Sequence, residues 1–248
     1  MSVSALAEEK LVLRMAGVSK RFPGVKALEN VHLEVGRAEI HALLGENGAG
    51  KSTLLKILSG AYGADAGTID LFDERLAFAT PHDAQRAGIV TIYQEFTLAP
   101  DMTIAENVFI GREPGTRLFV NWRRLAEETR AIIERIGLKR NPMTPVRDLS
   151  VAEQQLVEIA RALSMRSRII VMDEPTSALS EAEVANLANI VRALKAEGLS
   201  ILLVEQDVMT AFEISDYSYV LESGRVTAHG LPIELLQMNK IRDSYLGM

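Results

Sequence analysis

The chain has 248 residues, of which 48% are hydrophobic and 24% charged, and it contains no cysteine. The apolar fraction is sufficient for a hydrophobic core, which excludes a disordered chain, and the lack of cysteine excludes disulfides, thiolate metal sites and thiol nucleophiles. The net charge of −6, with no cluster of basic residues, argues against nonspecific binding of nucleic acid.

Near its N-terminus the chain carries Glu8 and Glu9, where a secretory signal would be basic and then apolar. No apolar run approaches the roughly 20 residues that a transmembrane helix needs. We therefore expect a cytoplasmic protein without a membrane span.

Short β-branched runs and alternating apolar positions predict a series of strands. They lie at residues 11–15, 31–35, 40–44, 68–72, 88–93, 169–172, 200–204, 217–221 and 225–228. Between several of them the apolar residues follow helical spacing, as at Leu54, Ile57 and Leu58 and at Leu156, Ile159, Ala160 and Leu163. Because parallel strands need crossover connections, this alternation predicts an α/β core with a mostly parallel sheet.

The segment from about 95 to 165 departs from this pattern, because it is mostly helical and rich in charge. We expect a helical subdomain here, inserted in the core. The first 35 residues or so, with residues 68–80, predict a small antiparallel layer. Residues 1–248 are thus expected to form a single domain made of these parts.

A complete match to the pattern G-x-x-x-x-G-K-[ST] follows the strand predicted at 40–44 and precedes a predicted helix. It consists of Gly45, Glu46, Asn47, Gly48, Ala49, Gly50, Lys51 and Ser52. Glycines allow backbone N–H groups to surround a phosphate, and the helix N-terminus adds partial positive charge. The pattern predicts a phosphate-binding loop, in which Lys51 reaches the β- and γ-phosphates of a nucleotide and Ser52 ligates Mg²⁺. The alternative is a glycine-rich turn with only a structural role.

A second predicted strand, at 169–172, ends in the adjacent carboxylates Asp173 and Glu174. We expect Asp173 to hold Mg²⁺ through water. Glu174 is placed to polarise a water that attacks the γ-phosphate. A strand that ends in a solvated acidic turn is the alternative, and the nearby phosphate loop disfavours it.

Together these motifs resemble the nucleotide-binding subunit of ATP-binding cassette (ABC) transporters over essentially the whole chain. The resemblance implies a P-loop NTPase fold with a RecA-like core, an antiparallel β-subdomain and an inserted α-helical subdomain. It implies that Phe22 stacks on adenine, although packing in the core is the alternative, and that the phosphate loop extends to Thr53. It also implies that Gln94 senses Mg²⁺ and the attacking water, and that residues 177–180 form the D-loop.

In the D-loop, Ser180 stands where the family usually has Asp, and two further motifs depart more strongly from the family pattern. In the signature segment, Leu149 and Ser150 are kept but both glycines are replaced, and Glu153 adds a negative charge where the family places the partner's γ-phosphate. Ser150 and Glu153 also form the capping box of a predicted helix, which is compatible with anion binding at that helix N-terminus. Gln206 occupies the place of the switch histidine. An amide donates a hydrogen bond but carries no charge, so we expect weaker stabilisation of the phosphate.

Within the family, two resemblances differ. Residues 11–198 resemble the first cassette of monosaccharide importers of the ribose, galactose and xylose type, which usually carry two cassettes in one chain. Residues 200–248 resemble the ATPases of branched-chain amino acid importers.

The resemblance implies an ATPase subunit that dimerises around two ATP molecules and drives uptake of a small solute, a monosaccharide first and a branched-chain amino acid second. Its implied partners are a second ATPase subunit, transmembrane permease subunits and, indirectly, an external solute-binding protein, at the cytoplasmic face of the plasma membrane. Glu174, Lys51, Gln94 and Gln206 would be catalytic, with Ser150 supplied across the dimer. The alternatives are a soluble ABC ATPase without a permease and a regulatory subunit that does not hydrolyse ATP.

Overall fold

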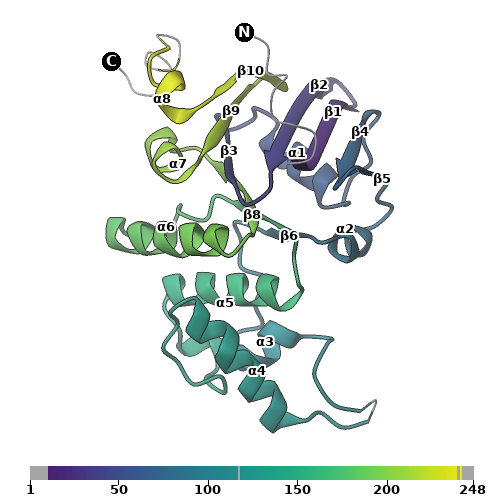
Figure 1. Ribbon diagram of the computed structural model, residues 1–248. Helices are drawn as coiled ribbons and strands as arrows, with labels where there is room; N and C mark the ends of the chain where they lie inside the picture. Colours follow the sequence, from purple (N-terminus) through teal and green to yellow (C-terminus); the bar gives the residue numbers. More distant parts are fainter. Residues whose placement is uncertain (1–10, 117, 239–240, 242–248) are drawn as a thin grey trace.

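The computed structural model describes residues 11–116, 118–238 and 241, and its strands form two sheets (Figure 1). The antiparallel sheet has the order β2-β1-β4-β5 and consists of β1 (Leu11–Phe22), β2 (Val25–Gly36), β4 (Ala66–Leu71) and β5 (Glu74–Leu76). The six-stranded sheet has the order β10-β9-β3-β8-β7-β6. Its strands are β3 (Ile40–Leu44), β6 (Ile89–Ile92), β7 (Ile169–Asp173), β8 (Ser200–Glu205), β9 (Tyr217–Glu222) and β10 (Arg225–Gly230).

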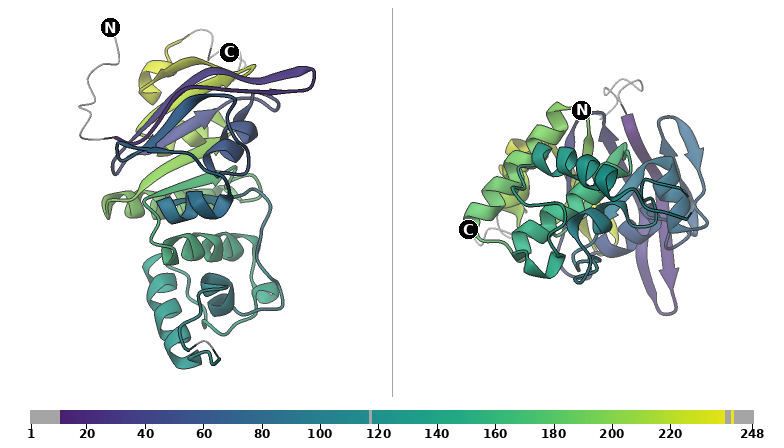
Figure 2. Two further views of the ribbon diagram at one scale, coloured as in Figure 1. Left: turned by 90° about the vertical axis from the view of Figure 1, so that its right-hand side faces the viewer. Right: turned by 90° about the horizontal axis from the view of Figure 1, so that it is seen from below.

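Neighbouring strands of the larger sheet are parallel, except that β10 runs antiparallel to β9. The helices that connect the strands are α1 (Lys51–Leu58), α2 (Pro81–Ala87), α3 (Ile104–Phe109), α4 (Trp122–Arg135), α5 (Val151–Ser164), α6 (Glu181–Ala196) and α7 (Val208–Ile214), with the short 3₁₀ helix η2 (Val146–Asp148), and α8 (Pro232–Leu235) follows the last strand. Figure 1 and the left view of Figure 2 place the antiparallel sheet and α3 to α5 at opposite ends of the molecule.

The larger sheet divides the core in two, because successive side chains of a strand point to opposite faces. In β7, Ile170 and Met172 pack in the cluster that contains the helices α3 to α5. Ile169 and Val171 pack in the other cluster, together with α1 and the antiparallel sheet. The alternation continues to Asp173, which therefore falls on the α1 face of the sheet.

Every strand predicted from the sequence overlaps an observed strand. Two of the predicted strands were too short, and one observed strand was not predicted. Strands β1 and β2 are 12 residues each, because they continue as a long hairpin beyond their buried halves into half-exposed residues. Strand β5 was missed because its three residues carry no buried alternation. Among the described residues, no helix is long and apolar enough to cross a bilayer.

Residues 95–165 contain α3, α4, η2 and α5, and the apolar residues of α5 pack as the helical spacing predicted. Ile159 and Ala160 are fully buried and Leu156 is nearly so. Leu163 is partly buried and packs against the same cluster. On α1, Leu54, Ile57 and Leu58 are likewise buried. That residues 1–248 make a single domain stays a prediction.

Candidate functional site: a phosphate loop beside two carboxylates

The loop between β3 and α1 has the backbone that a phosphate cradle needs. Gly48 and Gly50 have positive φ angles of 83° and 110°, a region that favours glycine. A Cβ at Gly50 would come within 2.7 Å of the carbonyl oxygen of Ala27, and one at Gly45 within 2.4 Å of that of Leu221. The loop is thus packed so closely against β2 and β9 that these positions require glycine.

A turn between β9 and β10 supports this loop from behind. Gly224 donates its backbone N–H to the carbonyl oxygen of Ala49 at 2.8 Å and accepts the N–H of Glu29 at 2.8 Å. Its φ of 77° and the carbonyl oxygen of Ala27, which lies 2.6 Å from where a Cβ would be, both require glycine. The sequence reasoning missed Gly224 as a site residue, because no local pattern ties it to the loop.

The topology brings the predicted polar residues to one edge of the sheet. Strands β3, β8, β7 and β6 are parallel neighbours, so their carboxyl ends meet at the same edge. The phosphate loop follows β3, Glu174 follows β7, Gln206 follows β8 and Gln94 comes shortly after β6.

Two amide donors and one ammonium group converge on the carboxylate of Glu174. Gln206 donates its amide N–H to Oε1 at 2.5 Å, and Gln94 donates to Oε2 at 3.1 Å. The ammonium of Lys51 lies 3.8 Å from Oε1. Glu174 also has a positive φ of 48°, which is uncommon for a residue with a side chain and shows that the surrounding fold constrains its backbone. Four residues predicted as catalytic are therefore in contact.

Lys51 is buried beneath the loop, with a side chain that is 5% exposed. Its Nζ donates to the carbonyl oxygen of Gly45 at 2.5 Å and to that of Glu46 at 3.3 Å. Burial lowers the pKa of Lys51, and the carboxylates of Glu174, Asp173 and Glu205 oppose that shift. The cation is thus held by a small acidic cluster at the base of the loop.

Asp173 ends β7 beside this cluster. Burial raises its pKa to about 6, with a further contribution from the neighbouring charge of Glu174, whereas Lys51 and Lys56 lower it. Two adjacent carboxylates without enough cationic compensation are the setting in which a divalent cation binds well.

A further carboxylate, Glu205, lies at the end of β8 and was missed by the sequence reasoning. Its side chain accepts hydrogen bonds from the backbone N–H of Thr176 at 3.2 Å and from the hydroxyl of Thr176 at 2.7 Å. Burial raises the pKa of Glu205 to about 7. A charged residue directly after the apolar residues 201–204 was the available signal.

Phe22 lies at the end of β1 and is 37% exposed, so packing in the core was the wrong alternative. Its ring makes an edge-to-face contact with Tyr62 at 5.6 Å, and the ammonium of Lys20 lies 5.8 Å from the ring centre. Its proposed contact with adenine stays a prediction.

Ser150 is the N-cap of α5, as its spacing from Glu153 predicted. The backbone N–H of Glu153 donates to the Ser150 hydroxyl at 3.3 Å, and the Glu153 carboxylate accepts the backbone N–H of Ser150 at 2.9 Å. These polar contacts are local to α5, on the helical side of the molecule, and do not join Ser150 to the Glu174 cluster.

The residues present fit a nucleotide and its magnesium ion. A cavity of about 400 Å³ lies over the loop, lined by residues that include Gly48, Lys51, Thr53 and Glu174. The first N–H groups of α1 have no partner within the helix and are available to a phosphate. Ser52, Asp173 and Gln94 offer the oxygen ligands that Mg²⁺ prefers.

This combination defines a P-loop nucleotide-binding site on a parallel sheet, and the comparisons identify its family. A family model described as an ABC transporter matches residues 28–177. The chain belongs to the ABC transporter family.

Two of the curated relatives are named as ATP-binding proteins of sugar import. The chain is 45% identical over 230 residues to ribose import ATP-binding protein RbsA 3 of Rubrobacter xylanophilus, covering 93% of this chain and 46% of that protein. It is 45% identical over 216 residues to xylose import ATP-binding protein XylG of Thermoanaerobacter pseudethanolicus, covering 86% and 43%. The chain therefore spans less than half the length of these relatives, and the predicted resemblance to monosaccharide importers is confirmed.

Solved structures confirm the predicted fold. The ADP conformation of MJ1267, an ATP-binding cassette of an ABC transporter, superposes with a TM-score of 0.85 at 28% identity, covering 96% of this chain and 99% of that one. A nucleotide-free ATP-binding cassette from an ABC transporter gives 0.84 at 28% identity, covering 96% and 100%.

Proposed function

We propose that this chain binds and hydrolyses ATP as the ATPase subunit of an ABC importer for a monosaccharide. The observation that carries the proposal is the contact of Lys51, Gln94 and Gln206 with Glu174 beside the phosphate loop. The names of the ribose and xylose import relatives support the cargo class.

In this proposal, hydrolysis is an in-line attack of water on the γ-phosphate. Glu174 orients and polarises the water, and the two amides fix the direction of its carboxylate. Lys51 leaves the loop carbonyls for the phosphates and stabilises the charge that moves during transfer. Ser52, Asp173 and Gln94 would hold Mg²⁺, which neutralises charge on the β- and γ-phosphates.

We place a second cassette against this one, head to tail, so that Ser150 of each faces the γ-phosphate held by the other. The separation of Ser150 from the Glu174 cluster within one chain supports this arrangement. Phe22, exposed beside Tyr62, is the proposed adenine platform. Residues 1–248 would form one ATPase domain, in which residues 95–165 are the helical subdomain.

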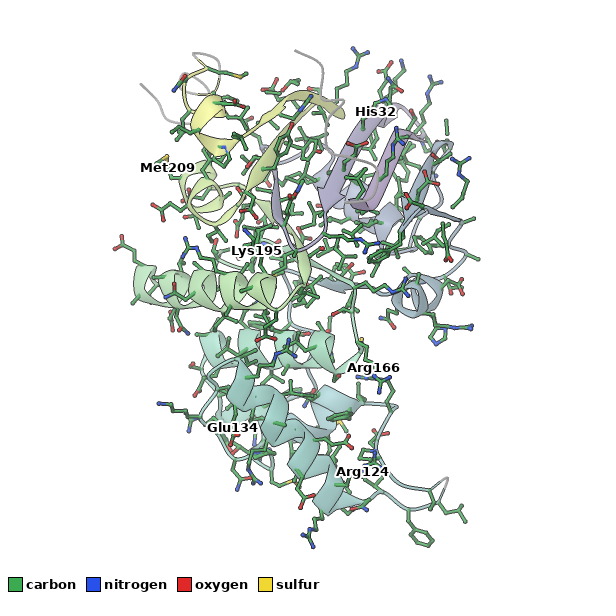
Figure 3. The ribbon with its side chains drawn as sticks, viewed as in Figure 1. His32, Arg124, Glu134, Arg166, Lys195 and Met209 are labelled. Carbon is green, nitrogen blue, oxygen red and sulfur yellow. The ribbon has the colours of Figure 1, made fainter. Side chains whose placement is uncertain are left out.

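The proposed permease contact is a groove of about 700 Å³ between α2, β6 and the helical layer. The described residues that line it include Arg86, Arg112, Arg161 and Arg166 and no Asp or Glu. Figure 3 shows Arg166 just beyond α5, in the region between α2 and the helical layer. Such a lining suits an acidic loop of a permease at the cytoplasmic face of the plasma membrane, with a solute-binding protein acting on its other side.

Substitution Glu174→Gln tests the ATPase assignment. The variant should bind ATP but lose turnover by about a hundredfold or more, because the general base is removed. It should also accumulate an ATP-dependent dimer in size-exclusion chromatography. Glu134→Gln, on the exposed face of α4 (Figure 3), is the matched control and should behave as the parent. Turnover by Glu174→Gln at the parental rate would contradict the assignment.

Cargo is tested separately, by deleting the gene in its native organism. Loss of growth on ribose or xylose as sole carbon source, with unchanged uptake of leucine, is the expected result. Loss of leucine uptake alone would favour the branched-chain amino acid alternative.

A further inference from the structure

Arg140 and Glu153 form a two-point ion pair at the N-terminus of α5. The guanidinium donates from Nε to Oε1 of Glu153 at 2.7 Å and from Nη2 to Oε2 at 3.1 Å. Oε2 also accepts the backbone N–H of Ser150. One carboxylate therefore joins Arg140, which follows α4 in the chain, to the N-cap serine of the proposed composite site.

The negative charge of Glu153 would repel a phosphate at the N-terminus of α5, and Arg140 neutralises this charge. The N-terminus of a helix carries partial positive charge, and its unpaired N–H groups favour anions. Glu153, in the first turn of α5, brings a full negative charge to that place, where it opposes a phosphate. Arg140 returns one positive charge at hydrogen-bond distance, so that the helix N-terminus keeps a net attraction for an anion.

The pair lies partly at the surface. The side chains of Arg140 and Glu153 are 44% and 24% exposed, where a single ion pair contributes little to folding and a bidentate arginine–carboxylate pair somewhat more. The geometry nevertheless fixes Arg140 by two hydrogen bonds and directs both toward the same carboxylate. The arginine also lowers the pKa of Glu153, which keeps that group an ionised acceptor in the capping box.

We propose that Arg140 is a positioning residue of the composite ATP site, which neutralises Glu153 so that Ser150 and the first turn of α5 can receive the γ-phosphate held by a second cassette. The proposal rests on the proposed function, because it needs the head-to-tail dimer. In this sequence Val151 and Ala152 replace the two glycines of the family signature, and the ion pair of Arg140 with Glu153 lies at the same helix N-terminus.

A charge-rescue cycle tests this role in the Glu174→Gln protein, where ATP-dependent dimerisation is measured by size-exclusion chromatography with light scattering. Arg140→Ala should raise the ATP concentration for half-maximal dimerisation about tenfold, because Glu153 is left uncompensated. Glu153→Gln should stay within about twofold of the parent, since an amide oxygen still accepts the Ser150 N–H. The double variant should return to within about twofold of the parent.

Arg124→Ala is the matched control, because Arg124 pairs with Glu128 at 2.6 Å on α4 of the same helical layer (Figure 3). It should leave dimerisation unchanged. Thermal unfolding of each monomer separates folding from dimerisation, and the melting temperatures of Arg140→Ala and Arg124→Ala should be alike.

Two results would overturn the role of Arg140 alone. Dimerisation of Arg140→Ala at the parental ATP concentration would remove any need for the arginine. A double variant as weak as Arg140→Ala would mean that the arginine acts otherwise than through the charge of Glu153. If the Glu174→Gln parent binds ATP and never dimerises, the composite site and the role of Arg140 fail together.

Discussion

Gln206 donates its side-chain N–H to Oε1 of Glu174 at 2.5 Å. The amide at this position thus holds the proposed general base directly, in a place where the family resemblance implies a histidine. Because Gln94 donates to the other oxygen of Glu174 at 3.1 Å, side chains of the protein itself orient both oxygens of the carboxylate. An amide in place of histidine is expected to stabilise the phosphate less strongly. It can still orient Glu174, because that hydrogen bond does not need a charged imidazole.

Removing the amide should therefore slow hydrolysis. Gln206→Ala deletes one of the two hydrogen bonds that orient Glu174, and a bond to a charged group contributes about 1.5–3 kcal/mol. We expect kcat to fall about tenfold to a hundredfold with little change in KM, measured as phosphate release. Gln206→His keeps a donor and should stay at or above the parental kcat.

Gln237→Ala, on an exposed residue after α8, controls for the loss of an amide and should be silent. A Gln206→Ala protein with unchanged kcat would show that Gln94 alone orients the carboxylate.

Substitution of Phe22 tests the proposed stacking of its ring on adenine. Stacking of an aromatic side chain on a base contributes about 1–3 kcal/mol, so Phe22→Ala should raise KM for ATP about tenfold and leave kcat nearly unchanged. Phe22→Tyr should restore the parental KM, because it keeps the ring. If Phe22→Ala binds ATP as tightly as the parent, the exposed ring beside Tyr62 serves another purpose.

The parts of the site that lie in short stretches of sequence could be predicted from those stretches. The glycines, Lys51 and Ser52 follow one another, and the carboxylates of Asp173 and Glu174 end one apolar strand. Gln94 and Gln206 were accessible only through the family resemblance, because a glutamine after a strand has no distinctive pattern of its own. Their meeting at Glu174 depends on strand order, which brings the ends of β6, β7 and β8 together.

The residues that sequence reasoning missed act across the fold. Gly224 supports the phosphate loop through a contact with Ala49, and Arg140 compensates Glu153 from a different segment. Neither relationship follows from spacing along the chain. The capping box of Ser150 and Glu153 was predictable because its residues are close in sequence. The pairing of Arg140 with Glu153 was not, because it depends on how the chain after α4 packs against α5.

Gly224 can be tested against a glycine with the same φ angle. Gly224→Ala should raise KM for ATP several-fold and lower the melting temperature, because the new methyl group would meet the carbonyl of Ala27 at 2.6 Å and displace the turn that bonds Ala49. Gly137 has the same φ of 77°, and no atom lies within 4 Å of the place that its Cβ would occupy.

Gly137→Ala should therefore carry only the conformational penalty of about 1 kcal/mol and leave KM unchanged. Equal effects of the two substitutions on KM would refute the proposed support of the loop by the β9–β10 turn.

Removing the charge of a buried carboxylate should have opposite effects on stability at Glu205 and at Glu158. Burial raises the pKa of Glu205 to about 7, so the folded protein holds that proton more tightly than the unfolded chain does. Its contribution to stability is present below the ordinary pKa of 4.5 and is lost as the pH rises through 7. Glu205→Gln keeps an oxygen for Thr176 and should raise the melting temperature by about 5 °C at pH 8, with a smaller gain at pH 5.5.

Glu158 is the matched comparison, since it is equally buried but is bonded to Thr97 at 2.9 Å and paired with Arg161. Glu158→Gln should lower the melting temperature at pH 8, because the partly buried Arg161 loses its counter-ion. Thermal unfolding of both variants between pH 5.5 and 8.5, without nucleotide, measures the two effects. A lower melting temperature of Glu205→Gln at pH 8 would contradict this prediction. It would mean that Lys51 stabilises the Glu205 anion, so that the buried charge favours the folded state.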